Sequence, residues 1–256
     1  MPMTQVPLFR RIADALRDAI LSGELAPGEP IPSEHELAAR FETTRVTVRK
    51  AIALLKADGL LATQQGKPTT VRPRPAVQML TTGANWRRRR STGEANYNAE
   101  AAAQGHVARQ ELRSVEHVPM PAEISARFDV PEGTPAIVRR LRYLVDDEPM
   151  QLVNAYYLAA RFSGTPVEEQ RRIRGGVSAL IEDPAGPIRQ RFVQFVEELE
   201  IRMPWPDERD LLAIPDGVPL ARVFRVGHAA SGEILEVLDS RMPGDRHSFQ
   251  FVIDIP

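Results

Sequence analysis

Apolar residues in the first 60 positions recur at helical spacing in three short segments. Each segment places its apolar side chains three or four residues apart, so that they share one face of a helix. Ser33 and Thr44 precede the second and third segments, where a hydroxyl can cap the first helical turn. The three apolar stripes are Phe9, Ile12, Ala13, Leu16 and Ile20; Leu37, Ala38 and Phe41; and Val48, Ile52 and Leu55. This pattern predicts three amphipathic helices packed around one small core.

The pattern changes after Gly59, which is suited to ending the third helix. Residues 60–63 and 69–71 are rich in leucine, valine and threonine, and they flank a turn at residues 64–68. We therefore predict a β-hairpin with a glycine and a lysine at its tip. A pair of short helices followed by such a hairpin is typical of a winged helix-turn-helix, a fold that binds DNA.

The third predicted helix carries Arg45 and Arg49 one turn apart, so both project from one side. Arginine can pair bidentately with guanine in the major groove, and we expect Arg45, Thr47 and Arg49 to contact base edges. We expect Ser33, Glu34, Thr44 and Lys67 to contact the DNA backbone or to orient the groups that bind DNA, and Gly66 to permit the wing turn and a close approach to the minor groove. Helix capping alone is the alternative for the first three of these, and a solvated surface is the alternative for the two arginines.

A weak internal repeat organises the second half of the chain. Each copy has a Met-Pro pair, a short helix (122–129 or 206–213), a Pro-acidic-Gly-x-Pro turn and two β-runs. The β-runs are 137–145 and 150–158 in the first copy and 220–228 and 234–242 in the second, and further strands are expected at 107–117, 188–202 and 249–253. Such units can share one antiparallel sheet with helices on one face, which predicts an α+β fold.

Residues 73–95 interrupt both patterns and are interpreted as a linker. It begins with the Pro-Arg-Pro sequence 73–75 and contains Trp86 followed by four arginines, 87–90. The arginines suit either a solvated flexible tether or an auxiliary clamp on DNA phosphates. The predicted organisation is a DNA-binding domain at 1–72, the linker, and a second domain at 96–256.

Charge is distributed unevenly along the 256 residues. The net charge is −1, yet residues 1–100 hold 15 Lys/Arg against 10 Asp/Glu, and the remaining residues hold 18 against 24. A basic half joined to an acidic half is expected when only the first meets phosphate.

Composition also limits the chemistry and the location of the protein. Cysteine is absent, which excludes disulfides and thiolate metal sites. His106, His117, His228 and His247 lack metal-ligand spacing, so we expect no metal or cofactor. No apolar run is long enough to span a bilayer, and the N-terminus has no signal-peptide core, so a cytoplasmic protein is expected.

The first 72 residues resemble the GntR family of bacterial transcription regulators. The segments that carry the resemblance are Pro7–Leu16, Gly23–Gly28, Ile31–Glu34 and Thr44–Arg49. The family usually has glycine where Pro68 stands and a larger apolar residue where Thr70 stands. The resemblance implies a dimeric regulator that reads a short inverted repeat of double-stranded DNA.

Residues 100–250 resemble the UTRA effector domain of the HutC-type branch of that family. The matching segments are Arg139–Tyr143, Glu148–Leu152, Tyr156, Gly175–Val177, Glu197–Pro204 and Glu236–Asp239. Many relatives have Glu where Val153 stands and Pro where Leu158 stands. The resemblance implies a chorismate-lyase-like antiparallel sheet with helices, which binds a small-molecule effector and forms a homodimer.

Candidate effector contacts follow from both the pattern and the resemblance. Arg140 and Arg142 alternate along one strand, which brings two guanidinium groups to one face, suited to carboxylate or phosphate. The resemblance places further candidates around the same cleft, namely Tyr156, Glu198, Arg202, Glu236 and Asp239. An internal network of ion pairs between these arginines and acids is the alternative.

The combined prediction is an effector-controlled, sequence-specific DNA-binding transcription regulator that represses its target genes. A homodimer would present two winged helices to half-sites about 10 bp apart. Two alternatives stay open: a DNA-binding protein whose second domain only dimerises, and a lyase-like enzyme. The chain has no G-x-S-x-G, H-E-x-x-H or phosphate-loop motif, so we expect no enzymatic activity.

Overall fold

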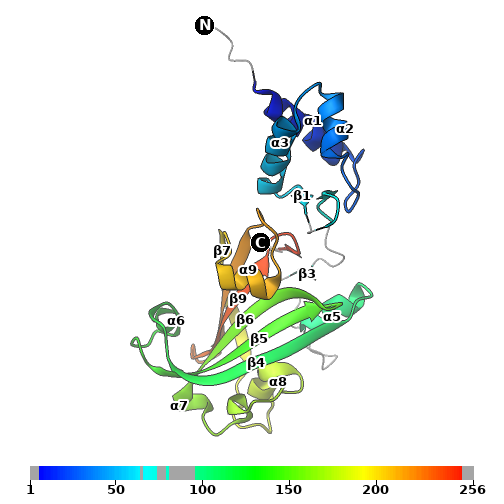
Figure 1. Cartoon of the computed structure of the whole chain (residues 1–256). Helices are drawn as coiled ribbons and strands as arrows, with labels where there is room; N and C mark the ends of the chain where they lie inside the picture. Colours follow the sequence, from blue (N-terminus) through cyan, green and yellow to red (C-terminus); the bar gives the residue numbers. More distant parts are fainter. Residues whose placement is uncertain (1–5, 64–65, 74–78, 81–95, 250–256) are drawn as a thin grey trace, which may run out of the picture. The chain divides into compact units, whose positions relative to one another are not determined.

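The computed structural model describes residues 6–63, 66–73, 79–80 and 96–249. The chain splits into two compact units, one of residues 1–76 with 214–218 and one of residues 77–213 with 219–256 (Figure 1). Each unit is described separately.

The first unit contains the three predicted helices. They are α1 (Leu8–Ser22), α2 (Glu34–Arg40) and α3 (Arg45–Ala57). Their apolar stripes meet in one core, which consists of Ile12, Ala13, Leu16, Ile31, Leu37, Val48, Ala51, Ile52, Leu55, Leu61 and Val71. Gly23 ends α1 with a φ of 83°, a left-handed conformation that favours glycine.

A short antiparallel hairpin follows α3, as predicted. Its strands are β1 (Leu61–Ala62) and β2 (Thr70–Val71), and Leu61 lies opposite Val71. Both of these side chains are buried, so the hairpin is anchored to the helical core through one face. Gly66 lies in the connecting turn with a φ of 76°, whereas Gln64 and Gln65 lie outside the described residues.

The second unit is built on one six-stranded antiparallel sheet in the order β4-β5-β6-β9-β8-β7. Its strands are β4 (Ala108–Pro119), β5 (Pro135–Val145), β6 (Glu148–Leu158), β7 (Phe192–Arg202), β8 (Leu220–Ala229) and β9 (Ile234–Pro243). A separate parallel pair joins β3 (Met79–Leu80) to β10 (His247–Ser248). The strand predicted at 249–253 is not tested, because residues 250–253 lie outside the described residues and Phe249 alone is not in a strand.

The strand order confirms the internal repeat. One copy runs β4, α6 (Ala122–Phe128), β5 and β6, and the other runs β7, α9 (Pro206–Leu212), β8 and β9. The two copies meet where β6 pairs with β9 and Asn154 lies opposite Asp239. The first strand of each copy, β4 or β7, therefore forms an edge of the sheet.

Helices cover both faces of the sheet. Ile124 and Phe128 of α6 pack against one face, with Val138, Tyr156, Phe224, Val226 and Val237 beneath them. The other face is covered by the segment between the two copies, which contains α7 (Ala159–Phe162), the 3₁₀ helix η3 (Pro166–Glu168) and α8 (Gly176–Glu182) (Figure 1). We refer to these as the α6 face and the α8 face. The repeat predicted helices on one face only, and the α8 face corrects that expectation.

The core of the first unit yields a stability prediction. Leu55 is fully buried, so Leu55→Ala should lower the free energy of unfolding by about 2–5 kcal/mol through lost burial and the cavity left behind. Val46 on the same helix is 62% exposed, and Val46→Ala is the matched control, with an expected change below about 0.5 kcal/mol. Urea unfolding followed by circular dichroism measures both. Equal effects of the two substitutions would contradict the described core.

Candidate DNA-binding surface and effector site

The start of α2 is fixed by a reciprocal capping arrangement. The Ser33 hydroxyl accepts a hydrogen bond from the backbone N–H of Glu36 at 3.2 Å, and the Glu36 carboxylate accepts one from the N–H of Ser33 at 2.7 Å. Hydrogen bonds that the Glu36 carboxylate receives from the side chain and the backbone of Ser33 lower the pKa of Glu36. Ser33 therefore caps α2, as the capping alternative predicted. Capping does not exclude a role in DNA binding, because the amides of a capped helix start can still face a phosphate.

Thr44 caps α3 in a similar way. Its Oγ1 accepts from the backbone N–H of Thr47 at 3.3 Å, and the two hydroxyls lie 3.1 Å apart. The side chain of Thr47 is thus held beside the helix start. This leaves the next residues, Arg45 and Val46, at the exposed N-terminal turn of the helix.

Arg45 and Arg49 project from one side of α3, as their spacing predicted. Glu34 of α2 accepts from Arg49 Nε at 2.9 Å and from an Arg45 terminal nitrogen at 3.3 Å. Both arginine side chains are 61% exposed. Surface ion pairs of this kind contribute at most about 1 kcal/mol, so a nucleic acid can displace them. Of the two roles expected for Glu34, backbone contact or orientation, this geometry favours orientation of the two arginines.

Val46 is an exposed apolar residue that the sequence analysis did not identify. It lies between Arg45 and Thr47, and its side chain is 62% exposed. An apolar group on a helix that enters the major groove can contact the methyl group of thymine. Its position off the buried stripe of α3 was the signal that could have identified it.

The wing residues Gly66 and Lys67 are both exposed. The positive φ of Gly66 allows the turn without steric cost. Lys67 is therefore available to a phosphate.

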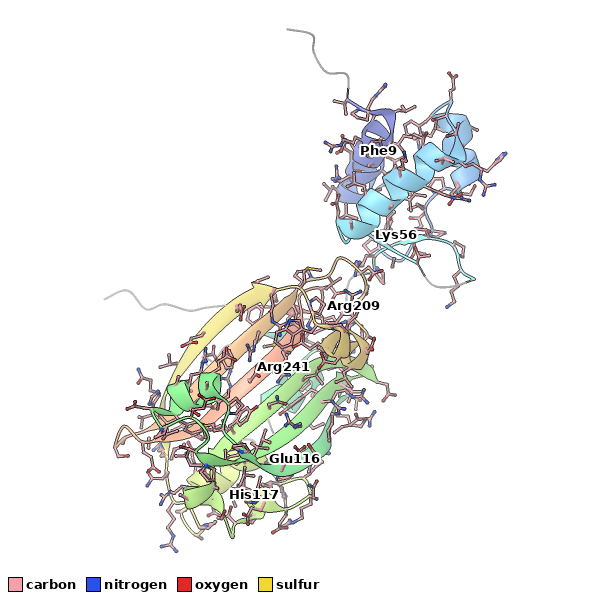
Figure 2. The ribbon with its side chains drawn as sticks, turned by 60° about the vertical axis from the view of Figure 1, so that its left-hand side comes forward. Phe9, Lys56, Glu116, His117, Arg209 and Arg241 are labelled. Carbon is pink, nitrogen blue, oxygen red and sulfur yellow. The ribbon has the colours of Figure 1, made fainter. Side chains whose placement is uncertain are left out.

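On the α6 face, the two arginines of β5 pair with acids of the edge strand β4. Arg140 Nε lies 3.3 Å from Glu116, and an Arg142 terminal nitrogen lies 2.7 Å from Glu111. The hydrogen bond from Arg142 lowers the pKa of Glu111. Figure 2 shows Glu116 on this strand, away from Arg241. In this structure Arg140 and Arg142 therefore both form internal ion pairs, which was the alternative to effector binding.

Asp239 forms the centre of a second ionic cluster on the α6 face. It is buried on β9, where it accepts from Arg222 Nε at 2.9 Å and from Arg241 at 3.0 Å. Arg222 also lies 2.8 Å from Glu123 of α6. Burial, and then the charge of Asp239, raise the pKa of the neighbouring Tyr156. The structure thus brings Asp239 and Tyr156 together.

Two other predicted effector residues lie far from Arg140 on the same face. Glu198 pairs with Arg127, and Arg202 lies 2.7 Å from Glu208 of α9. Both belong to β7, four strands away from β5, a separation of about 19 Å at the usual strand spacing. The expectation of one shared cleft is wrong for this pair, because the strand order places the two copies side by side.

Glu236 lies on the opposite, α8 face. Successive side chains of a strand point to opposite faces, and Glu236 is three residues before Asp239. Its carboxylate accepts a hydrogen bond of 2.6 Å from the Tyr157 hydroxyl, and burial raises its pKa. The expected cleft is therefore wrong for Glu236 as well.

Two residues missed by the sequence analysis lie on the same face of the sheet as Glu236. Arg139 is 3% exposed and donates to the carbonyl oxygens of Val167 at 2.7 Å, Glu169 at 3.0 Å and Arg171 at 2.7 Å. It thus fastens the covering segment to β5. The Tyr143 ring packs on the same face, 4.7 Å from the ring of Tyr97 in α5 (Asn96–Ala103). Arg139 and Arg140 are neighbours on β5, so strand alternation places their side chains on opposite faces of the sheet. This alternation was the signal that could have distinguished Arg139 from Arg140.

Two further observations concern the described residues alone. They include no group of three His, Asp or Glu side chains arranged to hold a metal ion. Among their helices, none combines the length and the apolar character needed to cross a bilayer.

Two family profiles match the chain. The profile described as bacterial regulatory proteins of the gntR family matches residues 8–71. The profile of the UTRA domain matches residues 103–248. The first range contains α2, α3 and the wing, and the second contains the whole six-stranded sheet.

Full-length relatives share both parts. The HTH-type transcriptional regulator Rv0792c of Mycobacterium tuberculosis is 29% identical over 98% of this chain and 87% of its own length. The HTH-type transcriptional repressor NagR of Bacillus subtilis is 25% identical over 97% of this chain and 96% of its own length. A crystal structure described as a GntR-family transcriptional regulator matches with a TM-score of 0.66 at 22% identity, covering 98% of this chain and 99% of that chain. This last similarity concerns the fold.

The raised pKa of Glu236 predicts a pH-dependent effect of Glu236→Gln. Because the folded-state pKa lies above the ordinary 4.5, the native protein loses stability as pH rises from 4.5 through the raised value. Glutamine does not ionise and still accepts from Tyr157, so its thermal midpoint should exceed that of the wild type at neutral pH and approach it below about pH 4.

Glu111→Gln is the control, because hydrogen bonding to Arg142 lowers the pKa of Glu111. That substitution should not stabilise the protein at neutral pH. Differential scanning fluorimetry across the pH range tests both. A gain for Glu236→Gln that does not change with pH would contradict an ionised, buried carboxylate.

Proposed function

The chain belongs to the GntR family of bacterial regulatory proteins and carries a UTRA domain, and we propose that it is a homodimeric repressor without catalytic activity. It is a DNA-binding transcription regulator controlled by a small molecule. We propose that it acts in the cytoplasm on an inverted-repeat operator.

The exposed N-terminal half of α3 carries the DNA-binding part of the proposal. Arg45 and Arg49 share one side of the helix, and a single carboxylate, Glu34, orients both. Thr47 and Val46 lie between them and add a hydroxyl and an apolar surface. Together these groups can recognise guanine by paired hydrogen bonds and thymine by its methyl group.

The remaining predicted residues contact the DNA backbone in this proposal. The capped starts of α2 and α3, at Ser33 and Thr44, would place main-chain amides near phosphates. Lys67 at the wing tip would add a cation, with Gly66 allowing close approach. These contacts position the protein and carry no sequence information.

We propose a homodimer because one winged helix reads only one half-site. Two copies related by a two-fold axis would read an inverted repeat with half-site centres about 10 bp apart. Repression is supported by the relative NagR, which is a transcriptional repressor. An effector that binds the DNA-free arrangement more tightly would release the operator.

For the effector site, we propose the α8 face with Glu236 as the principal contact. Its buried carboxylate accepts from the Tyr157 hydroxyl, and Arg139 fastens the segment that covers it. A carboxylate in this setting suits an effector that offers hydroxyl or ammonium donors. Ligand binding beneath residues 159–190 would change the packing of that segment.

A second candidate is the α6 face around Arg140, Tyr156 and Asp239. The observation in its favour is the concentration of arginines on adjoining strands, since Arg222 and Arg241 join Arg140 there. This group would suit an anion that displaces the carboxylates. Arg142 lies on the same strand face as Arg140, whereas Glu198 and Arg202 lie too far away to contribute to the same contact.

Operator binding provides the first test. Arg49→Ala should weaken binding by about 1–3 kcal/mol, or roughly 5- to 150-fold in Kd, because one base contact is lost. Duplexes selected from a random library serve as operator, and fluorescence anisotropy at fixed salt measures affinity against random competitor. Arg109→Ala on β4 is the control, because Arg109 is also an exposed, ion-paired arginine. Unchanged operator affinity for Arg49→Ala would exclude it from base recognition.

A metabolite screen by thermal shift tests effector control. A ligand that binds the native state raises the midpoint, and at 100 times its Kd it stabilises the protein by about 2.7 kcal/mol. We expect Glu236→Gln to reduce the shift and Arg140→Ala to retain it. The reverse result would favour the α6 face. If no compound in a broad panel changes either the midpoint or operator affinity, a second domain that only dimerises becomes the better interpretation.

A further inference from the structure

The exposed face of α3 has an apolar side chain near its centre. Val46 is 62% exposed, and it is not one of the apolar residues that form the core of the first unit or pack against it. A single exposed apolar residue is ordinary, so exposure alone indicates nothing. What distinguishes Val46 is its place on the helix.

Helix geometry places Val46 opposite the core. The buried residues of α3 are Val48, Ala51, Ile52 and Leu55. At about 100° of rotation per residue, Val46 lies within about 20° of the direction opposite the middle of this buried stripe. In the first two turns of α3, no other side chain points more directly away from the core. A recognition helix that enters the major groove with its core side outward would therefore direct Val46 toward the base edges.

Cationic side chains lie on both sides of Val46. Arg45 and Arg49 lie about 100° and 60° away around the helix on one side, and Lys50 lies about 40° away on the other. The two arginines share the carboxylate of Glu34, whereas exposed Lys50 has no ion-pair partner among the described residues. Positive charge on both flanks suits a groove that is bordered by phosphates on both sides. Val46 would then lie over the bases between them.

The stability of the free protein does not account for a valine at this position. A β-branched side chain has a slightly lower helix propensity than an unbranched one. Val46 also gains little from burial, since most of its surface is exposed. Alanine or a polar residue would serve the isolated helix at least as well. The side chain therefore suits a contact that forms only when DNA is bound.

The chemistry of the major groove limits what that contact can be. The valine side chain has no hydrogen-bond donor or acceptor, so it does not distinguish the polar patterns of the bases. The apolar group that the groove offers is the C5-methyl group of thymine. A cytosine methylated at C5 presents a methyl group at the same position of the ring. A contact with Val46 would therefore respond to the methyl group and not to the identity of the pyrimidine.

We propose that Val46 reads the C5 substituent of one pyrimidine in each half-site, so that methylation of a cytosine at that position strengthens binding. The inference rests on DNA recognition by α3 in the proposed function. It adds DNA methylation as a regulatory input that is separate from the small-molecule effector. Arg45 and Arg49 would still supply the contacts with guanine.

The wild-type protein allows a test that needs no substitution in the chain. An operator selected from a random library is remade with thymine, uracil, cytosine or 5-methylcytosine at each pyrimidine position in turn. Thymine and uracil differ by one methyl group, as do 5-methylcytosine and cytosine. Fluorescence anisotropy at fixed salt should show one position per half-site at which loss of the methyl group raises Kd about three- to fivefold in both comparisons, as expected for one buried methyl group.

Val46→Ala should remove both methyl preferences, because alanine lacks the two methyl groups that would make the contact. The variant removes no buried side chain, and circular dichroism checks that it remains folded. Arg49→Ala should weaken binding to every duplex and keep the ratio between methylated and unmethylated forms. Val107→Ala is the matched control, because Val107 is a 73% exposed valine of the second unit, and it should change neither affinity nor ratio.

The outcomes separate this inference from the proposed function. Methyl preferences that persist in Val46→Ala, or that disappear only in Arg49→Ala, would overturn the role of Val46. Equal binding of methylated and unmethylated pyrimidines at every position would also overturn it, while operator selectivity and its loss in Arg49→Ala would leave the proposed DNA recognition intact. A protein that selects no operator from the library would contradict the proposed function and the inference together.

Discussion

The pairing of β6 with β9 is the constraint on which the second unit depends. Five residue pairs, from Leu152–Arg241 to Tyr156–Val237, join the two copies of the repeat into one sheet. Neither copy alone has enough strands to bury two faces, because a three-stranded sheet is near the lower limit of stability. Joining them at their last strands leaves their first strands, β4 and β7, at the edges. The same junction gives the sheet two continuous faces, each large enough to pack its own layer of helices.

Strand alternation then determines which polar side chains lie on each face of the sheet. Tyr156 and Tyr157 are adjacent in the chain, yet the first lies near Asp239 on the α6 face and the second bonds Glu236 on the α8 face. The α6 face gathers arginines and acids that neutralise one another. The α8 face holds a carboxylate whose hydrogen-bond partner is an uncharged hydroxyl. Two faces of one sheet thus carry different polar groups, although the sequence mixes their residues.

Local features were predicted well because the interactions that cause them are local. Ser33 and Thr44 cap helices by accepting hydrogen bonds from backbone N–H groups three residues away. The repeat was recognisable from its turns and short helices. The grouping of the candidate effector residues was not predicted well, because it depends on strand order and register between distant segments. Glu236 and Arg202 are assigned to a common cleft with Arg140, but strand alternation places Glu236 on the opposite face, and the order β5-β6-β9-β8-β7 places Arg202 four strands away. Similarly, the role of Arg139 depends on a segment about 30 residues away.

The two units also differ in how the arginines discussed above are paired, and this difference fits a protein whose first unit binds DNA. In the second unit, Arg140, Arg142 and Arg222 each have a carboxylate within about 3 Å. In the first unit, Arg45 and Arg49 share the single carboxylate of Glu34, so this group of three side chains carries one net positive charge. Both pairs are exposed, and a phosphate or a guanine edge can replace the carboxylate at little cost. The ion pairs with Glu34 are therefore compatible with the DNA contacts proposed for Arg45 and Arg49.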